Sequence, residues 1–312
     1  MCVFEHRAVN NVSKTTKKEN MKKVLQLVFA SVATAVLFSY TFKPNMPAFL
    51  APEGYIACYK HAIKDQIELD AILPGFARLH EAPAYFKLIN ETGKMIIYPS
   101  ADGMDAHAYF IKSKNKTNKW LIVIQEWWGL NDYIKREAET YSAELGDINV
   151  IALDMYDGKV AKTPDSAMVY MRSAKSERLE SIVKGAITYA GDKAKIYTIG
   201  WCFGGGWSLQ STLLAGSQAA GCVMYYGRPE TDINKLKTIN CDVIGFFGNQ
   251  DKGIPPPTVV AFEKNMKEAG KQLIINRYNA NHGFANPSNP AYDKEATEDA
   301  HIKAVTFIKA RM

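Results

Sequence analysis

The strongest constraint on the fold comes from short apolar runs that alternate with longer segments of helical spacing. A run that is apolar at every position is typical of a strand buried on both faces. Strands that alternate with helices predict an α/β fold, a mostly parallel central sheet covered by helices on both faces. The predicted strands are Met95–Tyr98, His107–Lys112, Trp120–Gln125, Asn149–Leu153, Lys195–Ile199, Gly221–Tyr226, Val243–Phe247 and Leu273–Tyr278.

Helical spacing fills most of the segments between these runs. The predicted helices are Asp132–Leu145, Pro164–Tyr189, Phe203–Leu214, Thr258–Glu268 and Ala296–Ala310. Asn131 is the candidate N-cap of the first helix, because an asparagine there accepts a hydrogen bond from the first turn. Folds of this class place their sites at the carboxyl ends of the strands, so the residues just after each buried run are the ones to inspect.

The first 44 residues form a basic and apolar leader. They contain six Lys and one Arg against two Glu, and they therefore carry +5 of the net charge of +6. Met21-Lys22-Lys23 precedes an apolar run over residues 24–42, which is the layout of a secretory signal. We expect export to the periplasm or the extracellular space. An uncleaved N-terminal membrane anchor is one alternative, since about 19 residues nearly span a bilayer, and a buried helix of the domain is another.

The rest of the chain divides into an N-terminal extension, residues 45–94, and a main domain, residues 95–312. The composition of the whole chain, with 47% hydrophobic and 22% charged residues, is that of a soluble globular protein. Residues 45–312 are nearly neutral, so charge gives no reason to expect nucleic acid as a partner. Cys58 and His61 alone do not make a metal site, and we expect neither a metal nor a cofactor.

The five cysteines match neither a zinc motif nor a dense disulfide framework. Cys222 and Cys241 could pair in an exported protein, but two buried core thiols are the simpler interpretation.

Cys202 lies in the pattern Gly200-Trp201-Cys202-Phe203-Gly204, directly after a predicted strand and at the start of a predicted helix. This is the nucleophile-elbow pattern, with cysteine where serine is usual. Glycine at 200 and 204 removes the β-carbons that would clash in a sharp turn, and the helix N-terminus favours a thiolate. A buried structural cysteine in a glycine-rich turn fits this motif equally well.

Two further residues that follow predicted strands favour a catalytic Cys202 over a structural one. Asp251 comes shortly after Val243–Phe247, and His282 comes shortly after Leu273–Tyr278. Nucleophile, acid and histidine follow one another in this order in α/β-hydrolases. We therefore expect His282 to accept the proton of Cys202, or to hold it in a thiolate–imidazolium pair, and Asp251 to orient His282 and stabilise its cation.

Glu126 and Trp127 follow the strand Trp120–Gln125. The loop at this place supplies one oxyanion-hole N–H in α/β-hydrolases, and the residue after the nucleophile supplies the other. The backbone N–H groups of Trp127 and Phe203 are therefore the candidate donors. Burial would raise the pKa of Glu126 and allow it to exchange a proton with the thiol of Cys202. A structural, salt-bridged glutamate is the alternative.

From Met95 to the C-terminus the chain resembles the dienelactone hydrolase family. The resemblance rests on Gln125-Glu126-x-x-Gly129, Asp154-x-Tyr156, Gly200-x-Cys202-x-Gly204-Gly205, Tyr225-Tyr226-Gly227, Gly248-x-x-Asp251 and His282-x-Phe284. It implies an α/β-hydrolase fold with a Cys–His–Asp triad, no metal, and hydrolysis of an ester or lactone through an acyl-thioester. It also implies that Glu126 helps to generate the thiolate when substrate binds.

The chain departs from the family at the arginines that hold the carboxylate of dienelactone. Lys159 closes the stretch after the Asp-x-Tyr segment, and Asn286 stands shortly after the histidine. Lys159 or Arg228 is a candidate to replace one charge, and Tyr156 and Trp128 are candidates to contact an apolar or aromatic acyl group. We therefore expect a small-molecule ester or lactone other than dienelactone.

Two other functions remain open at this stage. The same triad could act as a thioesterase, amidase or peptidase, which a panel of substrates would distinguish. A non-catalytic exported binding protein could also keep the fold, and it would lack an unusually reactive Cys202.

Overall fold

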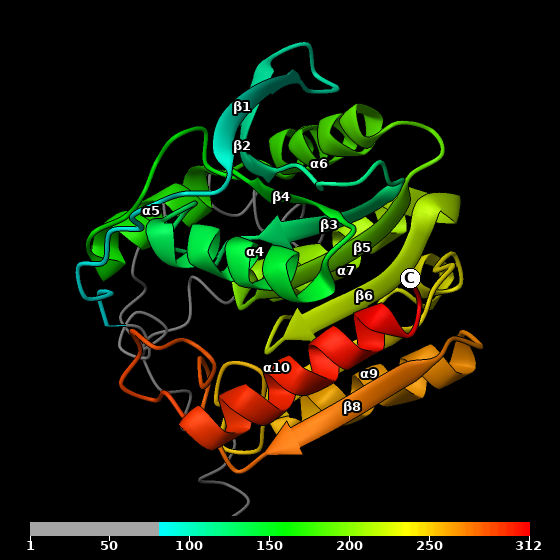
Figure 1. Cartoon of the computed structure of the whole chain (residues 1–312). Helices are drawn as coiled ribbons and strands as arrows, with labels where there is room; N and C mark the ends of the chain where they lie inside the picture. Colours follow the sequence, from blue (N-terminus) through cyan, green and yellow to red (C-terminus); the bar gives the residue numbers. More distant parts are fainter. Residues whose placement is uncertain (1–80) are drawn as a thin grey trace, which may run out of the picture. The chain divides into compact units, whose positions relative to one another are not determined.

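The computed structural model describes residues 81–312, which belong to the structural unit that runs from His61 to Met312 (Figure 1). The predicted leader and most of the predicted extension, residues 45–94, lie outside this described part. Within residues 81–312, no helix has both the length and the hydropathy to cross a membrane.

Eight strands form one sheet in the order β1-β2-β4-β3-β5-β6-β7-β8. Only the pairs β1–β2 and β2–β4 are antiparallel, and every later pair is parallel. The predicted mostly parallel sheet is therefore confirmed. The strands are β1 Lys94–Pro99, β2 Asp105–Ile111, β3 Lys119–Ile124, β4 Asn149–Leu153, β5 Lys195–Trp201, β6 Ala219–Tyr225, β7 Val243–Gly248 and β8 Leu273–Tyr278.

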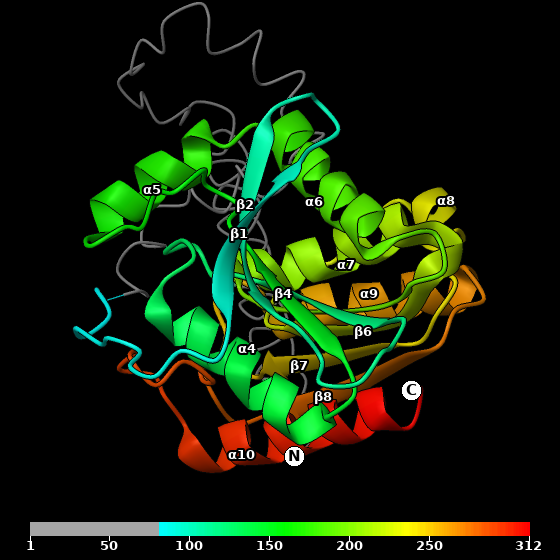
Figure 2. The same ribbon diagram turned by 45° about the horizontal axis from the view of Figure 1, so that its top comes forward.

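Helices cover both faces of this sheet. Figure 2 shows α4 and α10 on one face and α6, α7 and α9 on the other. The helices are α4 Asp132–Leu145, α5 Pro164–Ser173, α6 Ser176–Ala190, α7 Phe203–Ala215, α8 Ile233–Leu236, α9 Pro256–Glu268 and α10 Lys294–Lys309. The central strands are buried throughout, as expected for a sheet packed on both sides: each residue of β4 and β7 is buried.

The helix predicted over Pro164–Tyr189 is wrong as a single element. The backbone of Ala174 is extended, with φ −73° and ψ 111°, and it separates α5 from α6. Neither Gly nor Pro marks this break, so the helical spacing runs through it in the sequence. The short helix α8 was not predicted either. The start of α4 is as predicted, because the Asn131 side chain accepts a hydrogen bond from the N–H of Ile134.

Residues 84–88 lie along the first turns of α4. The N–H of Leu88 donates to Asp132 Oδ2 at 3.0 Å, and the Tyr133 hydroxyl donates to the carbonyl of Ala84 at 3.1 Å. The rings of Phe86 and Tyr133 are 4.9 Å apart. This segment therefore packs on the side of the domain where α4 begins, which is also the side on which β3 ends.

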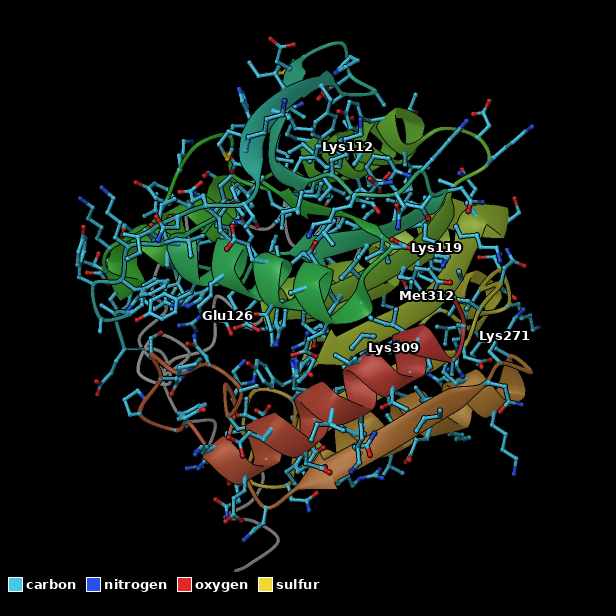
Figure 3. All side chains as sticks on the ribbon, in the orientation of Figure 1. Lys112, Lys119, Glu126, Lys271, Lys309 and Met312 are labelled. Carbon is cyan, nitrogen blue, oxygen red and sulfur yellow. The ribbon has the colours of Figure 1, made fainter. Side chains whose placement is uncertain are left out.

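The carboxyl ends of the parallel strands meet at one edge of the sheet. Figure 3 shows Glu126, just after β3, on the opposite side of the molecule from Lys119 and Lys271, which lie at the amino ends of β3 and β8. Cys202 follows β5, Asp251 follows β7 and His282 follows β8. The topology therefore brings the predicted catalytic residues to the same edge.

Candidate active site

Cys202 sits at the turn between β5 and α7 with an unusual backbone conformation. Its φ is +55° and its ψ is −116°, a region that residues with a side chain rarely adopt. A β-carbon on Gly200 would lie 2.1 Å from the carbonyl oxygen of Gly204, and one on Gly204 would lie 2.3 Å from that of Ile124. The predicted steric reason for these two glycines is therefore correct. The turn holds Cys202 at the N-terminus of α7.

Asp251 and His282 form a buried pair beside this turn. His282 Nδ1 lies 2.7 Å from Asp251 Oδ2, while Asp251 Oδ1 accepts the N–H groups of Gly253 and Ile254 at 2.7 and 2.8 Å. Burial raises the pKa of Asp251, but the charge and hydrogen bond of His282 and the two backbone donors outweigh burial and hold the pKa below its ordinary range. Asp251 therefore remains an anion that orients the imidazole.

His282 connects this anion to Cys202. Burial lowers the pKa of His282, but the charges of Asp251 and Cys202, together with side-chain hydrogen bonds to both, raise it well above its ordinary range. The ring of Tyr226 packs 5.0 Å from the imidazole. The structure thus brings together the three side chains predicted as nucleophile, base and acid.

Glu126 is buried, with 6% of its surface exposed, and both carboxylate oxygens have neutral donors. The Tyr226 hydroxyl donates to Oε1 at 3.2 Å, and Asn286 Nδ2 donates to Oε2 at 2.7 Å. Burial raises the pKa of Glu126 to about 7, although the charge of His282 and the two hydrogen bonds oppose the shift. Neither of these hydrogen bonds comes from a Lys or Arg side chain. With a pKa of about 7, the Glu126 carboxyl group can gain or lose a proton near neutral pH.

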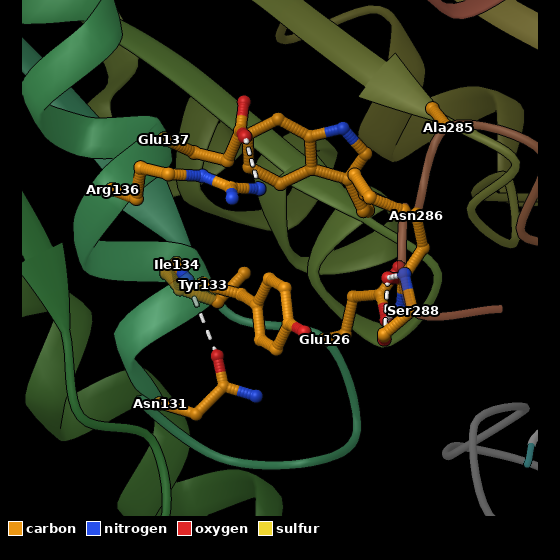
Figure 4. Close-up of a pocket in the computed structure, with 11 residues that line it drawn as sticks. Glu126, Asn131, Tyr133, Ile134, Arg136, Glu137, Ala285, Asn286 and Ser288 are labelled. Carbon is orange, nitrogen blue, oxygen red and sulfur yellow. Dashed lines mark hydrogen bonds and ion pairs between the residues drawn. The ribbon is translucent and has the colours of Figure 1, made fainter. Parts of the chain in front are cut away.

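A small pocket opens beside Glu126, between the start of α4 and the segment after His282 (Figure 4). Glu126 and Asn286 lie on one wall, while Arg136 and Glu137 of α4 lie on the other. Burial raises the pKa of Glu137, although Arg136 opposes this shift. The pocket therefore gives Glu126 a partly polar surrounding on the side of α4.

The two predicted oxyanion-hole residues are both at this edge. Trp127 is fully buried and its ring packs 4.9 Å from that of Trp128, directly after β3. Phe203 is the first residue of α7, and the N–H groups of a first helical turn have no acceptor within the helix. The carbonyl of Trp128 accepts the N–H of Ala161 at 2.8 Å, which ties the loop after β3 to the loop after β4.

The remaining predicted binding residues lie in different places. Tyr156 packs against Phe203, with ring centres 5.4 Å apart. Lys159 is exposed, and its Nζ lies over the ring of Tyr170 on α5, 5.8 Å from the centre. Arg228 is half-buried after β6, with its carbonyl close to Gly206 of α7, and burial lowers its pKa. Tyr156 is thus directly at the elbow, whereas the Lys159 ammonium is directed to α5.

Tyr226 and Asn286 are site residues that the sequence reasoning did not single out as such. Both donate to Glu126, and Tyr226 has a positive φ of 35° directly after β6. The available signal was their position, because each follows a strand end or the predicted histidine.

The described part of the chain contains no group of three His, Cys, Asp or Glu side chains that could hold a metal ion. Cys222 and Cys241 do not form a disulfide. Of the two buried core thiols that were expected, Cys222 is buried, whereas Cys241 is only partly buried against the core.

Comparison with known proteins gives a consistent result. The model of the dienelactone hydrolase family matches residues 106–312. A protein of Saccharolobus solfataricus assigned as a carboxymethylenebutenolidase is 24% identical over 259 residues, which are 69% of this chain and 98% of that protein. The protein usf of Aquifex pyrophilus is 28% identical over 211 residues, 62% of this chain and 90% of its own length.

A solved structure shares the fold. The crystal structure of a dienelactone hydrolase-like promiscuous phosphotriesterase from metagenomic libraries superposes with a TM-score of 0.60, at 19% identity, over 70% of this chain and 99% of its own. The eight-stranded sheet is therefore that of an α/β-hydrolase. With the family model matching about two thirds of its length, this chain belongs to the dienelactone hydrolase family, and it is a hydrolase of ester or lactone bonds.

Proposed function

We propose that Cys202 is the nucleophile of a Cys202–His282–Asp251 triad that hydrolyses a small-molecule ester or lactone. The observation that carries the proposal is the arrangement around Cys202. A cysteine with a left-handed backbone at a helix N-terminus is in hydrogen-bond contact with a histidine whose Nδ1 is 2.7 Å from a buried carboxylate. An inert core thiol needs neither the strained turn nor this histidine.

The proposed reaction runs in two halves. His282 takes the proton of Cys202, whose sulfur forms a bond to the acyl carbon, and the leaving alcohol takes that proton from His282 as its C–O bond breaks. In the second half His282 takes a proton from water, the hydroxide adds to the thioester, and the C–S bond breaks as His282 returns that proton to the Cys202 sulfur, which releases the acid. Asp251 stabilises the imidazolium in both halves, and the N–H groups of Trp127 and Phe203 hold the oxyanion.

Glu126 has a separate proposed role in activating the thiol. A carboxyl group with a pKa of about 7 can be either protonated or ionised near neutral pH. Its two neutral donors can release it at a smaller cost than a bidentate arginine would impose. We propose that ionised Glu126 accepts the thiol proton first, when substrate binds, and passes it to His282, which then delivers it to the leaving alcohol. Tyr226 and Asn286 hold the Glu126 carboxylate until then.

The substrate is proposed to be a neutral ester or lactone, not dienelactone. Asn286 donates to Glu126, and the Lys159 ammonium lies against Tyr170, so neither position presents an arginine to a substrate carboxylate. Buried aromatic rings of Trp127, Trp128 and Phe203 line the same edge and favour an apolar acyl group. The leader keeps its proposed role in export, either as a cleaved signal or as an anchor.

The deciding experiment compares Cys202→Ala with Cys241→Ala, a matched control in a half-buried thiol away from the turn. Each protein is assayed on p-nitrophenyl esters, lactones, thioesters and a peptide, and each is labelled with iodoacetamide. We expect Cys202→Ala to lose activity by about 1000-fold or more and to lose the fast-labelling thiol, while Cys241→Ala keeps both.

Full ester hydrolysis in Cys202→Ala would overturn the mechanism. Activity on thioesters or peptides but on no ester or lactone would keep the triad and overturn the proposed substrate class.

A further inference from the structure

Tyr156 places a hydroxyl group inside the protein, close to Cys202. It follows β4 in the loop that begins at Asp154, and only 4% of its surface is exposed. Its ring lies 5.4 Å from the ring of Phe203, the residue directly after the nucleophile. Burial, and next the charge of Cys202, raise the pKa of Tyr156 well above its ordinary range. The hydroxyl therefore stays protonated and can act only as a neutral donor or acceptor.

This hydroxyl has no hydrogen-bond partner among residues 81–312. The other buried tyrosines of the described chain all have one: Tyr98, Tyr109, Tyr141, Tyr197, Tyr225 and Tyr226. An unpaired buried hydroxyl costs about 1–3 kcal/mol, and buried tyrosines ordinarily find a partner for this reason. A position that tolerates this cost directly beside the nucleophile points to a ligand atom as the missing partner.

The backbone around Tyr156 is held in place by two polar side chains. Asp154 Oδ1 accepts the N–H of Tyr156 at 3.1 Å, and Asp154 Oδ2 accepts the N–H of Gly158 at 2.6 Å. Gln125 Oε1, at the end of β3, accepts the N–H of Met155 at 3.2 Å. The loop is thus tied to its own first residue and to the neighbouring strand, so the hydroxyl is positioned before substrate arrives.

We propose that the Tyr156 hydroxyl is a third oxyanion donor, which hydrogen-bonds the oxygen of the tetrahedral intermediate formed at Cys202. The inference rests on the proposed function, because it requires acyl transfer at this thiol. The acyl oxygen is neutral in the substrate and negative in the intermediate. A preorganised donor beside Phe203 therefore stabilises the transition state more than the ground state, and it raises kcat more than it lowers KM.

The test is Tyr156→Phe, with Tyr98→Phe as the matched control. The Tyr98 hydroxyl is also buried, but it donates to the carbonyl of Ile182 and lies outside the site. On p-nitrophenyl acetate we expect kcat of Tyr156→Phe to fall by roughly 100-fold, the effect typical of a lost oxyanion donor, with little change in KM. Its Tm should be unchanged or higher, because an unpaired hydroxyl is removed. Tyr98→Phe should show the reverse, a lower Tm with unchanged kcat.

Two further readouts separate a donor from a packing role. A trifluoromethyl ketone forms a tetrahedral adduct on a cysteine, so its affinity for Tyr156→Phe should fall in parallel with kcat. Labelling of Cys202 by iodoacetamide forms no oxyanion and should proceed at the wild-type rate.

Wild-type kcat and inhibitor affinity in Tyr156→Phe would overturn the donor role while the Cys202 mechanism stands. A loss of Tm together with kcat would make the residue structural and would also overturn it. Full activity of Cys202→Ala would instead mark failure of the proposed function itself, and the donor role would fall with it.

Discussion

Two buried carboxyl groups, Asp251 and Glu126, lie at the same edge of the sheet, and their pKa values are shifted in opposite directions. Asp251 is 2% exposed and Glu126 is 6% exposed, so burial alone would treat them alike. Asp251 has two backbone N–H donors and His282. Glu126 has two neutral side-chain donors, Tyr226 and Asn286. The partners, not the depth, distinguish the two sites.

The pKa values follow the partners. For both groups burial is the largest influence and raises the pKa, but at Asp251 the imidazole and the backbone donors reverse it, while at Glu126 the net shift is upward, to about 7. A permanently ionised acid suits the orientation of a histidine, and an acid that titrates near neutrality suits proton exchange with a thiol. The proposed mechanism thus assigns two different tasks to the two carboxyl groups.

Removal of the charge at Asp251 should have the largest effect. In Asp251→Asn the amide keeps the size of the side chain but cannot stabilise an imidazolium, so kcat should fall by about 10⁴-fold. The pKa of His282 should fall as well, because the charge of Asp251 is the chief cause of its rise. Steady-state kinetics and a titration of the imidazole by NMR would check both. A loss below about tenfold would show that His282 does not depend on this anion.

Removal of the charge at Glu126 should lower the rate less than removal of the charge at Asp251, and above neutral pH it should stabilise the folded protein. The pKa of Glu126 is raised in the folded state from 4.5 to about 7, so the folded protein binds the proton more tightly than the unfolded chain. Stability is therefore lost as the pH rises from about 4.5 to about 7, by about 3 kcal/mol at most. Glu126→Gln carries no such loss, and above pH 7 it should be the more stable protein.

Urea unfolding at pH 5 and pH 8 measures this difference, and the same variant should acylate more slowly than the wild type. The wild type and Glu126→Gln could instead change in stability by the same amount between pH 5 and pH 8. That result would show that Glu126 stays ionised in the folded state.

The positions of the proposed catalytic residues could be read from the sequence because they depend on local pattern. Each one lies within four residues of the end of a predicted apolar run, and the bounds of β4 and β8 are those that the runs indicate. The elbow at Cys202 is also local, because its glycines are required by atoms only four residues apart or on the adjacent strand. Patterns of this kind predict the fold and the order of the residues in the proposed triad.

Contacts between distant residues could not be predicted in the same way. Tyr226 and Asn286 are 100 and 160 residues away from Glu126 in the sequence, and nothing in their own neighbourhoods marks them as its donors. The missing partner of Tyr156 is harder still, since it depends on every atom around one hydroxyl. The break at Ala174 shows the same limit, because packing ends a helix where the residue types would continue it.

Asn286→Ala should produce the smallest effect and sharpen the comparison most. It removes the 2.7 Å hydrogen bond to Glu126 Oε2 and leaves the donors of Asp251 in place. This hydrogen bond lowers the pKa of Glu126, and a bond to a charged group is worth about 1.5–3 kcal/mol. The acid limb of the pH profile of kcat/KM should therefore move up by about one to two pH units, with an unchanged rate above it. Asn281→Ala, an exposed change beside His282 that removes a hydrogen bond to Gln250, is the control and should leave the limb unmoved. A limb that stays in place in Asn286→Ala belongs to the His282–Asp251 pair, and the proton transfer assigned to Glu126 would then have no kinetic support.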